Sequence, residues 1–102
     1  MISGFTTAVP FTKNDENLFT DLVKEEQETV KAWIQKNLWL RETPNYHHTS
    51  YGIKHILQHD TGIYLTNNQF KHAMAVCGFY PVNAWALNWN YCLSQASPAF
   101  KK

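Results

Sequence analysis

The chain has 102 residues, a length that suits one domain able to bury a core without a metal or a disulfide. Hydrophobic residues make up 44% and aromatic residues 15% of the chain, a composition that excludes an intrinsically disordered protein. The formal net charge is only +1, which disfavours strong non-specific DNA binding because that needs a dense basic stripe.

Charge is divided unevenly along the chain. Seven of the eight acidic residues precede position 43, whereas all five histidines follow it. The first twelve residues contain no basic residue of the kind that begins a signal peptide. No run of about eighteen uncharged apolar residues, as a membrane-spanning helix needs, occurs in the sequence. We therefore expect no secretion and no membrane partner, and a cytoplasmic location. In that compartment we expect Cys77 and Cys92 to be small, mostly buried hydrophobic residues rather than a disulfide pair.

The first 42 residues predict an arm followed by an acidic helical brace. Gly4 and Pro10 favour an extended arm over residues 1–12, and Asn14 or Asp15 can cap a helix that follows. Residues 13–42 predict the brace, which could be one long helix or two. Apolar residues at helical spacing continue to about residue 40. Its apolar stripe consists of Leu18, Phe19, Leu22, Val23, Val30, Trp33, Ile34 and Leu38, and Trp39 is a further candidate member. Residues 43–50 then predict a loop, because Pro44 disfavours helix before it.

Two shorter helices follow. Ser50 can cap a helix over 51–60, which Gly62 is placed to end. Thr66 and Gln69 form the pattern of a capping box and predict a second helix, which stops at Gly78. Its inward positions are Phe70, Ala73, Met74 and Cys77, and its solvent positions are Asn67, Asn68, Lys71 and His72.

The last part predicts a short strand and a tail. In residues 88–94 the apolar Trp89, Tyr91 and Leu93 alternate with polar or small residues, which is the pattern of a strand with one buried face. Residues 95–102 predict a frayed tail. The sequence thus predicts a single domain of the α+β class, mostly helical, in which residues 50–94 form a winged-helix-like helix-turn-helix unit with a short C-terminal strand pair.

This order suggests a nucleic-acid contact. The second helix of such a unit can enter the major groove, where Asn67 and Asn68 would read adenine edges and Lys71 would meet phosphate, with His72 beside them. A homodimer would present two such helices to paired half-sites. The alternative is a compact fold with ordinary polar surface residues.

Three segments also carry a resemblance to known proteins: VKAWIQKNL at 30–38, residues 50–79 from SYGIKHILQHD to AVCGF, and NWNYCLS at 88–94. Over roughly residues 26–94 the chain resembles a group of small uncharacterised proteins carried by phages and integrative elements of Gram-positive bacteria. The resemblance implies an accessory protein of a mobile element: a regulator, a replication helper or an anti-CRISPR inhibitor of a host defence nuclease. It transfers no functional residue.

Binding to a nucleic-acid-processing host protein is the competing prediction. The chain holds more large rings than one small core readily hides, and aromatic side chains are favoured interface anchors. Trp39 and Trp85 are the candidate anchors. Glu25, Glu26 and Glu28 could mimic nucleic acid toward a basic partner, although such a run is more often the solvated face of a helix.

Catalysis and metal binding are the weaker hypotheses. His55 and His59 share a helix face, and Asp60, His47 or His48 could complete a zinc site, yet no metal-binding motif is present. Neither cysteine lies in a catalytic signature, and phosphate-binding glycine loops are absent. We therefore expect a non-enzymatic binding protein without a cofactor.

Overall fold

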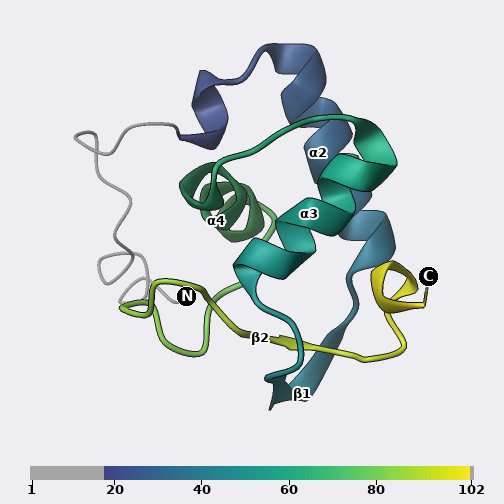
Figure 1. The fold of residues 1–102 in the computed structure, drawn as a ribbon, viewed down its shortest axis with the longest axis vertical. Coiled ribbons are helices and arrows are strands. Elements are labelled where there is room, and N and C mark those ends of the chain that lie inside the picture. The colour runs from purple at the N-terminus through teal and green to yellow at the C-terminus, as the bar shows by residue number, and fades with distance from the viewer. Residues whose placement is uncertain (1–17, 102) are drawn as a thin grey trace.

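The computed structural model describes residues 18–101. Within them the protein is α+β, with three α-helices and one two-stranded antiparallel sheet. Figure 1 shows the helices grouped together and the sheet beneath them. The elements are η1 (Phe19–Asp21), α2 (Lys24–Asn37), β1 (Leu40–Asn45), α3 (Ser50–Thr61), α4 (Asn67–Val76), β2 (Tyr91–Leu93) and η2 (Pro98–Phe100). The expected arm over 1–12 and the caps Asn14 and Asp15 lie outside the described residues.

The acidic brace is not one continuous helix in its described part. Phe19–Asp21 forms only a 3-10 turn, closed by the Asp21 carboxylate, which accepts the Leu18 N–H at 2.8 Å. The backbone is extended at Leu22 and Val23, and α2 begins at Lys24. Phe19 is buried as predicted, but Val23 is exposed and contributes nothing to the apolar stripe.

The brace also ends earlier than the sequence predicts. α2 ends at Asn37, and the predicted continuation to about residue 40 is wrong because Leu38 is already extended. The predicted loop over 43–50 is wrong in its first part, since Leu40–Asn45 forms β1 and pairs with β2. Pro44 is tolerated there because β1 has a partner on one side only and its register is interrupted between Leu40 and Asn45.

The ends of α3 and α4 mostly follow the predicted signals. Thr49, rather than Ser50, caps α3, and its hydroxyl accepts the Gly52 N–H at 3.4 Å. Gly62 ends α3 with φ 77°, the left-handed conformation that glycine adopts without strain. The capping box that opens α4 is confirmed, because Thr66 and Gln69 each bond the other's backbone N–H at 3.0 Å.

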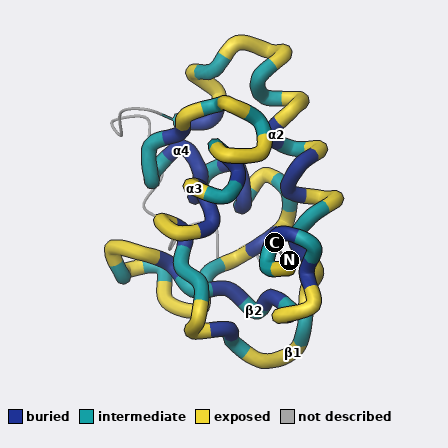
Figure 2. The backbone as a smooth tube through the Cα atoms, turned by 45° about the vertical axis from the view of Figure 1, so that its right-hand side comes forward, coloured by how far each residue is buried: buried dark blue, intermediate teal, exposed yellow. Residues whose placement is uncertain are grey.

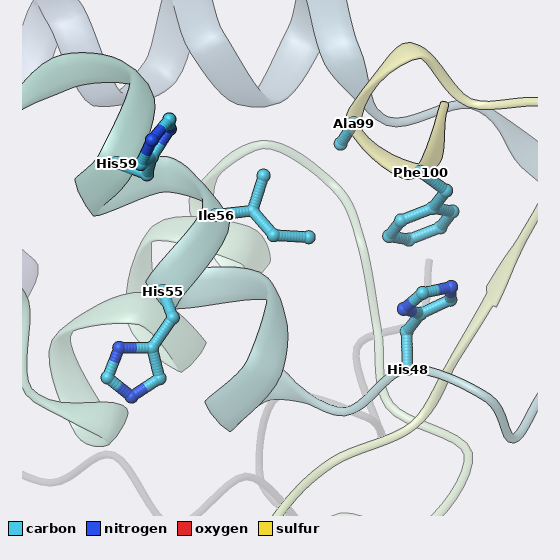
Figure 3. A pocket seen from close by; sticks show the side chains of 6 residues that line it. All are labelled: His48, His55, Ile56, His59, Ala99 and Phe100. Carbon is cyan, nitrogen blue, oxygen red and sulfur yellow. The ribbon is translucent and has the colours of Figure 1, made fainter. Parts of the chain in front are cut away.

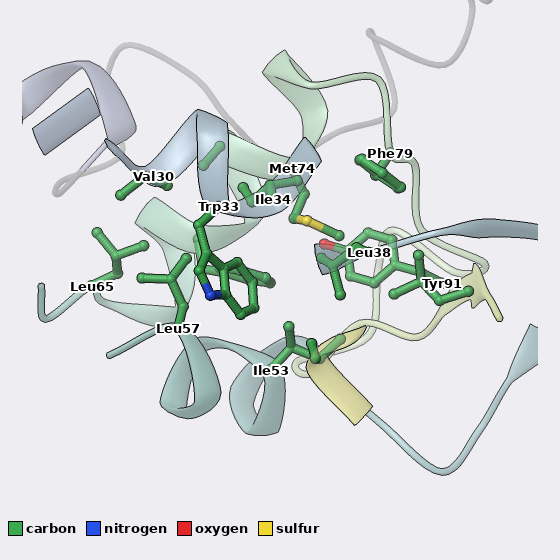
Figure 4. Packing of buried hydrophobic residues seen from close by; sticks show 14 of the residues in the cluster. Val30, Trp33, Ile34, Leu38, Ile53, Leu57, Leu65, Met74, Phe79 and Tyr91 are labelled. Carbon is green, nitrogen blue, oxygen red and sulfur yellow. The ribbon is translucent and has the colours of Figure 1, made fainter. Parts of the chain in front are cut away.

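One apolar cluster joins the helices to the sheet, as Figure 4 shows. The predicted alternation of burial is confirmed, since Trp89, Tyr91 and Leu93 are buried and Cys92 is only half-buried. The predicted strand over 88–94 is too long, because β2 spans only Tyr91–Leu93. In Figure 2 the buried stretches of α4 and β2 run through the interior while the outer turns are exposed. The buried apolar residues are Phe19, Val30, Trp33, Ile34, Leu38, Ile53, Leu57, Leu65, Phe70, Ala73, Met74, Phe79, Trp89, Tyr91, Leu93 and Ala99.

The predicted frayed tail is wrong for residues 95–101. Ser97 is fully buried, and its hydroxyl accepts the Trp39 N–H at 2.9 Å and donates to the Ser94 carbonyl at 2.6 Å. Ala99 in η2 is buried in the main cluster. The tail is thereby fixed beside the start of β1. Among residues 18–101, no helix has the length and apolar character needed to cross a bilayer.

Candidate interaction surfaces

Lys71 does not face solvent, so that prediction is wrong. Lys71 is only 8% exposed, and its ammonium nitrogen lies 4.7 Å from the centroid of the Trp89 ring. Burial lowers the pKa of Lys71, which is the expected response of an ammonium group taken out of water. A cation held over an indole inside the fold is not placed to meet a phosphate.

Asn67, at the start of α4, is half-buried rather than fully solvent-facing. Its side-chain oxygen accepts from the Ser50 hydroxyl at 2.9 Å. Its side-chain nitrogen donates to the Leu87 carbonyl at 3.1 Å and to the Asn88 side chain at 3.0 Å. The Asn67 amide therefore ties α4 to α3 and to the segment before β2, and these bonds compete with any contact to a base edge.

His72 and Asn68 are also half-buried, in contrast to their predicted solvent positions. The Nδ1 atom of His72 accepts the Phe19 N–H at 3.0 Å, and the two rings meet edge to face with centroids 6.1 Å apart. Burial lowers the pKa of His72, while the nearby carboxylate of Asp21 acts in the opposite direction. α4 thus brings the four predicted nucleic-acid residues onto one helix, but mostly in structural roles.

The segment between α4 and β2 carries the most exposed apolar side chains of the described chain. Trp85 is 75% exposed and Leu87 is 80% exposed. Pro81 pairs with Tyr91 as an isolated antiparallel bridge, and the Val82 N–H donates to the Asn90 carbonyl at 2.8 Å. We call residues 83–89, which this bridge closes, the 83–89 loop.

The backbone of the 83–89 loop is held in place by hydrogen bonds within the loop and by one to α4. The Asn83 side chain accepts the Trp85 N–H at 3.0 Å, and the indole N–H of Trp89 donates to the Ala84 carbonyl at 3.1 Å. The Leu87 carbonyl accepts from Asn67 of α4. The exposed side chains of Trp85 and Leu87 therefore project from a fixed backbone.

Trp39, the second predicted anchor, is exposed as well, but it lies elsewhere. It directly precedes β1, and its backbone N–H and carbonyl both bond residues of the C-terminal segment. In Figure 1 the start of β1 and the loop between α4 and β2 lie on opposite sides of the molecule. The structure does not bring the two predicted anchors into one patch.

The three predicted acidic residues lie near the start of α2. Glu25 and Glu26 occupy its first turn, where a negative charge is favoured by the helix dipole. Glu28 forms an exposed ion pair with Lys31 at 3.8 Å. Both observations agree with the simpler hypothesis of a solvated helix face.

The histidines do not form a metal site within residues 18–101, where no group of three or more metal-ligating side chains converges. Three of them instead line an open pocket of about 430 Å³ between α3 and η2, shown in Figure 3. The His48 ring is stacked on Phe100, with centroids 3.7 Å apart and planes 1° apart. The pocket is lined by His48, His55, Ile56, His59, Ala99 and Phe100. Sequence reasoning missed it because half of the stacked pair belongs to the predicted tail.

The two cysteines are free thiols. Burial raises the pKa of Cys77, which disfavours the thiolate that a nucleophile needs.

Comparisons of the chain with protein-family models, curated proteins and solved structures found no match.

Proposed function

We propose that the chain is a non-enzymatic binding module of winged-helix topology. Such a unit runs as helix, strand, two helices and then two strands joined by a loop called the wing. The same order is α2, β1, α3, α4, the bridge residue Pro81 and β2. The sheet supports the proposal too, because β2 pairs with β1 and also with Pro81. The 83–89 loop would then be the wing.

The 83–89 loop is the proposed contact with a partner protein. The observation that carries this proposal is the exposure of Trp85 and Leu87, 75% and 80%, on a hydrogen-bonded backbone. A tryptophan exposed in this way buries a large apolar area on docking. A loop that is already ordered loses little conformational entropy when it binds.

Reading of duplex DNA by α4 is the weaker proposal. Lys71 is the only lysine or arginine in α4, and its ammonium group lies over Trp89 inside the fold. The Asn67 amide bonds Ser50 and Leu87. A major-groove helix without an exposed cation lacks the phosphate contacts that supply most DNA affinity.

The resemblance to phage and integrative-element proteins suggests the setting for this proposal. In the cytoplasm of a bacterial host the partner would be a nucleic-acid-processing protein, of which a defence nuclease is the leading candidate. The acidic residues Glu25, Glu26 and Glu28 lie on α2 and are a separate surface for a basic partner. A homodimer formed through the 83–89 loop is a distinct outcome that the solution mass would reveal.

Affinity capture followed by binding measurements with the purified partner tests the proposal. Trp85→Ala should weaken binding by roughly 30-fold, which corresponds to the 2 kcal/mol that defines a hot-spot residue. Trp39→Ala is the matched control, because this indole is also exposed but lies away from the loop. Unchanged affinity in both Trp85→Ala and Leu87→Ala would overturn the proposal.

A further inference from the structure

Two hollows adjoin on the outer face of α3. The first, of about 430 Å³, lies between α3 and η2 and is lined in part by His55 and His59. The second, of about 480 Å³, is lined by the same two histidines together with Gln58 and Tyr64. Since His55 and His59 are one helical turn apart and line both hollows, they form a ridge between them.

The first hollow has an apolar wall and a polar rim. Figure 3 shows Ile56 of α3 pointing toward the stacked rings of His48 and Phe100, with His55 and His59 on either side of Ile56. Planar apolar surface next to imidazole nitrogens suits a planar heterocycle that also makes hydrogen bonds. The second hollow offers the Tyr64 ring and the Gln58 amide, which are again a stacking face and a hydrogen-bonding group.

Few acidic groups on this face would repel an anionic ligand. Residues 43–59 contain no carboxylate and include four of the five histidines. Lys54 is only 4% exposed, and its ammonium group lies 5.0 Å from the Tyr51 ring centroid and 4.9 Å from that of Tyr64, which lines the second hollow. Burial also lowers the pKa of Lys54, so any phosphate contact on this face falls to the imidazole groups of the ridge.

Asp60 is the nearest acidic residue, and it is turned toward the helix packing. Its Oδ2 atom accepts from the Trp33 indole at 2.8 Å, and its side chain is only 15% exposed. Its Oδ1 atom lies 3.6 Å from His59 Nδ1. Neither hollow includes this carboxylate in its lining.

We propose that this face of α3 binds single-stranded nucleic acid, with one base in each hollow and the connecting phosphate over the ridge of His55 and His59. Two hollows with a common wall fit consecutive nucleotides better than one free nucleotide. Unpaired bases expose the faces that stack on aromatic rings, whereas duplex bases do not. This proposal does not depend on the proposed role of the 83–89 loop.

Fluorescence anisotropy with a labelled single strand of about ten nucleotides tests the proposal at low salt. We expect micromolar binding that weakens roughly tenfold in Tyr64→Ala, because stacking on one ring contributes about 1–3 kcal/mol per base. His59→Ala should also weaken binding. Both side chains are largely exposed, so both variants should fold. Tyr64→Ala also removes a ring from the buried Lys54 ammonium group, so its melting temperature is measured alongside binding.

Tyr46→Ala is the matched control, because Tyr46 is equally exposed and lines neither hollow. It should bind the strand like the wild type, as should Trp85→Ala, which separates this site from the 83–89 loop. A duplex of the same sequence and a free nucleoside monophosphate should both bind at least tenfold more weakly. The proposal fails if the strand does not bind at low salt, if the duplex or the monophosphate binds equally well, or if Tyr64→Ala has no more effect than Tyr46→Ala.

Discussion

The ammonium group of Lys71 lies 4.7 Å above the ring of Trp89, and both residues are buried. The lysine comes from α4 and the tryptophan from the segment that leads into β2. Their contact therefore couples the helix predicted to read DNA to the base of the 83–89 loop. It makes Lys71 a structural residue.

Lys71→Glu should lower the free energy of unfolding by about 2 kcal/mol or more, because it replaces a cation–π contact with a buried carboxylate. Lys71→Met keeps the aliphatic bulk without the charge and should change stability by less than about 1.5 kcal/mol. Urea denaturation measures both, with Lys101→Glu at an exposed position outside the α-helices as the control. Equal stability of Lys71→Glu and the wild type would show that the lysine is not buried over the indole.

The stability of the protein should fall in mild acid because of His72. Its Nδ1 atom accepts the Phe19 N–H, so a proton added there removes the acceptor. Burial lowers the pKa of His72 below its ordinary value of 6.5. The unfolded chain then binds the proton more readily than the folded one. The contribution of His72 to the free energy of unfolding is thus constant above about pH 6.5, and it decreases as the pH falls from there toward the lower pKa of His72 in the folded protein.

Denaturation of the wild type and His72→Gln from roughly pH 7.5 to pH 5 checks this expectation. The variant should lose less stability over that range than the wild type. It should keep part of the dependence, because burial lowers the pKa of His48 in the same direction. Parallel curves for the two proteins would contradict the role assigned to His72.

Substitution by alanine should change stability in opposite directions at Gly52, inside α3, and at Gly62, directly after it. Gly62 has φ 77°, so Gly62→Ala should lower the free energy of unfolding by about 1 kcal/mol through backbone strain alone, since an added Cβ meets no atom within 4 Å. Gly52 lies inside α3, where Gly52→Ala should raise stability by up to about 1 kcal/mol. Thermal melting of the pair tests the assignment. A destabilised Gly52→Ala together with an unaffected Gly62→Ala would contradict these backbone conformations.

Tyr91→Phe should leave stability unchanged or raise it by about 1 kcal/mol. The Tyr91 hydroxyl is buried and has no hydrogen-bond partner among the described residues. Figure 4 shows the ring inside the apolar cluster. Burial also raises the pKa of Tyr91 well above its usual value. A loss of more than about 1 kcal/mol in urea denaturation would reveal a partner for this hydroxyl.

The sequence predicts those features that depend on neighbouring residues. The Thr66 and Gln69 capping box and the left-handed Gly62 are local signals, and both are confirmed. The alternation of Trp89, Tyr91 and Leu93 also predicts their burial correctly, although only Tyr91 and Leu93 lie in β2.

Features that depend on distant residues could not be predicted in this way. β1 looks like a loop in sequence because Pro44 interrupts it, and it exists as a strand through pairing with β2. The tail is ordered by the bond between Ser97 and Trp39, 58 residues apart. Lys71 lies next to the apolar stripe of α4. It is buried because Trp89, which is distant in the sequence, packs against it.

Site-specific photo-cross-linking from position 87 tests the central claim most directly. A photoreactive phenylalanine derivative in place of Leu87 should form a covalent adduct with one protein in cells that produce the chain, and a second change, Trp85→Ala, should abolish it. The same derivative in place of Lys36, on an exposed position of α2, should give no such adduct. Adducts of equal yield from both positions, or an adduct that persists without Trp85, would contradict a docking role for the 83–89 loop.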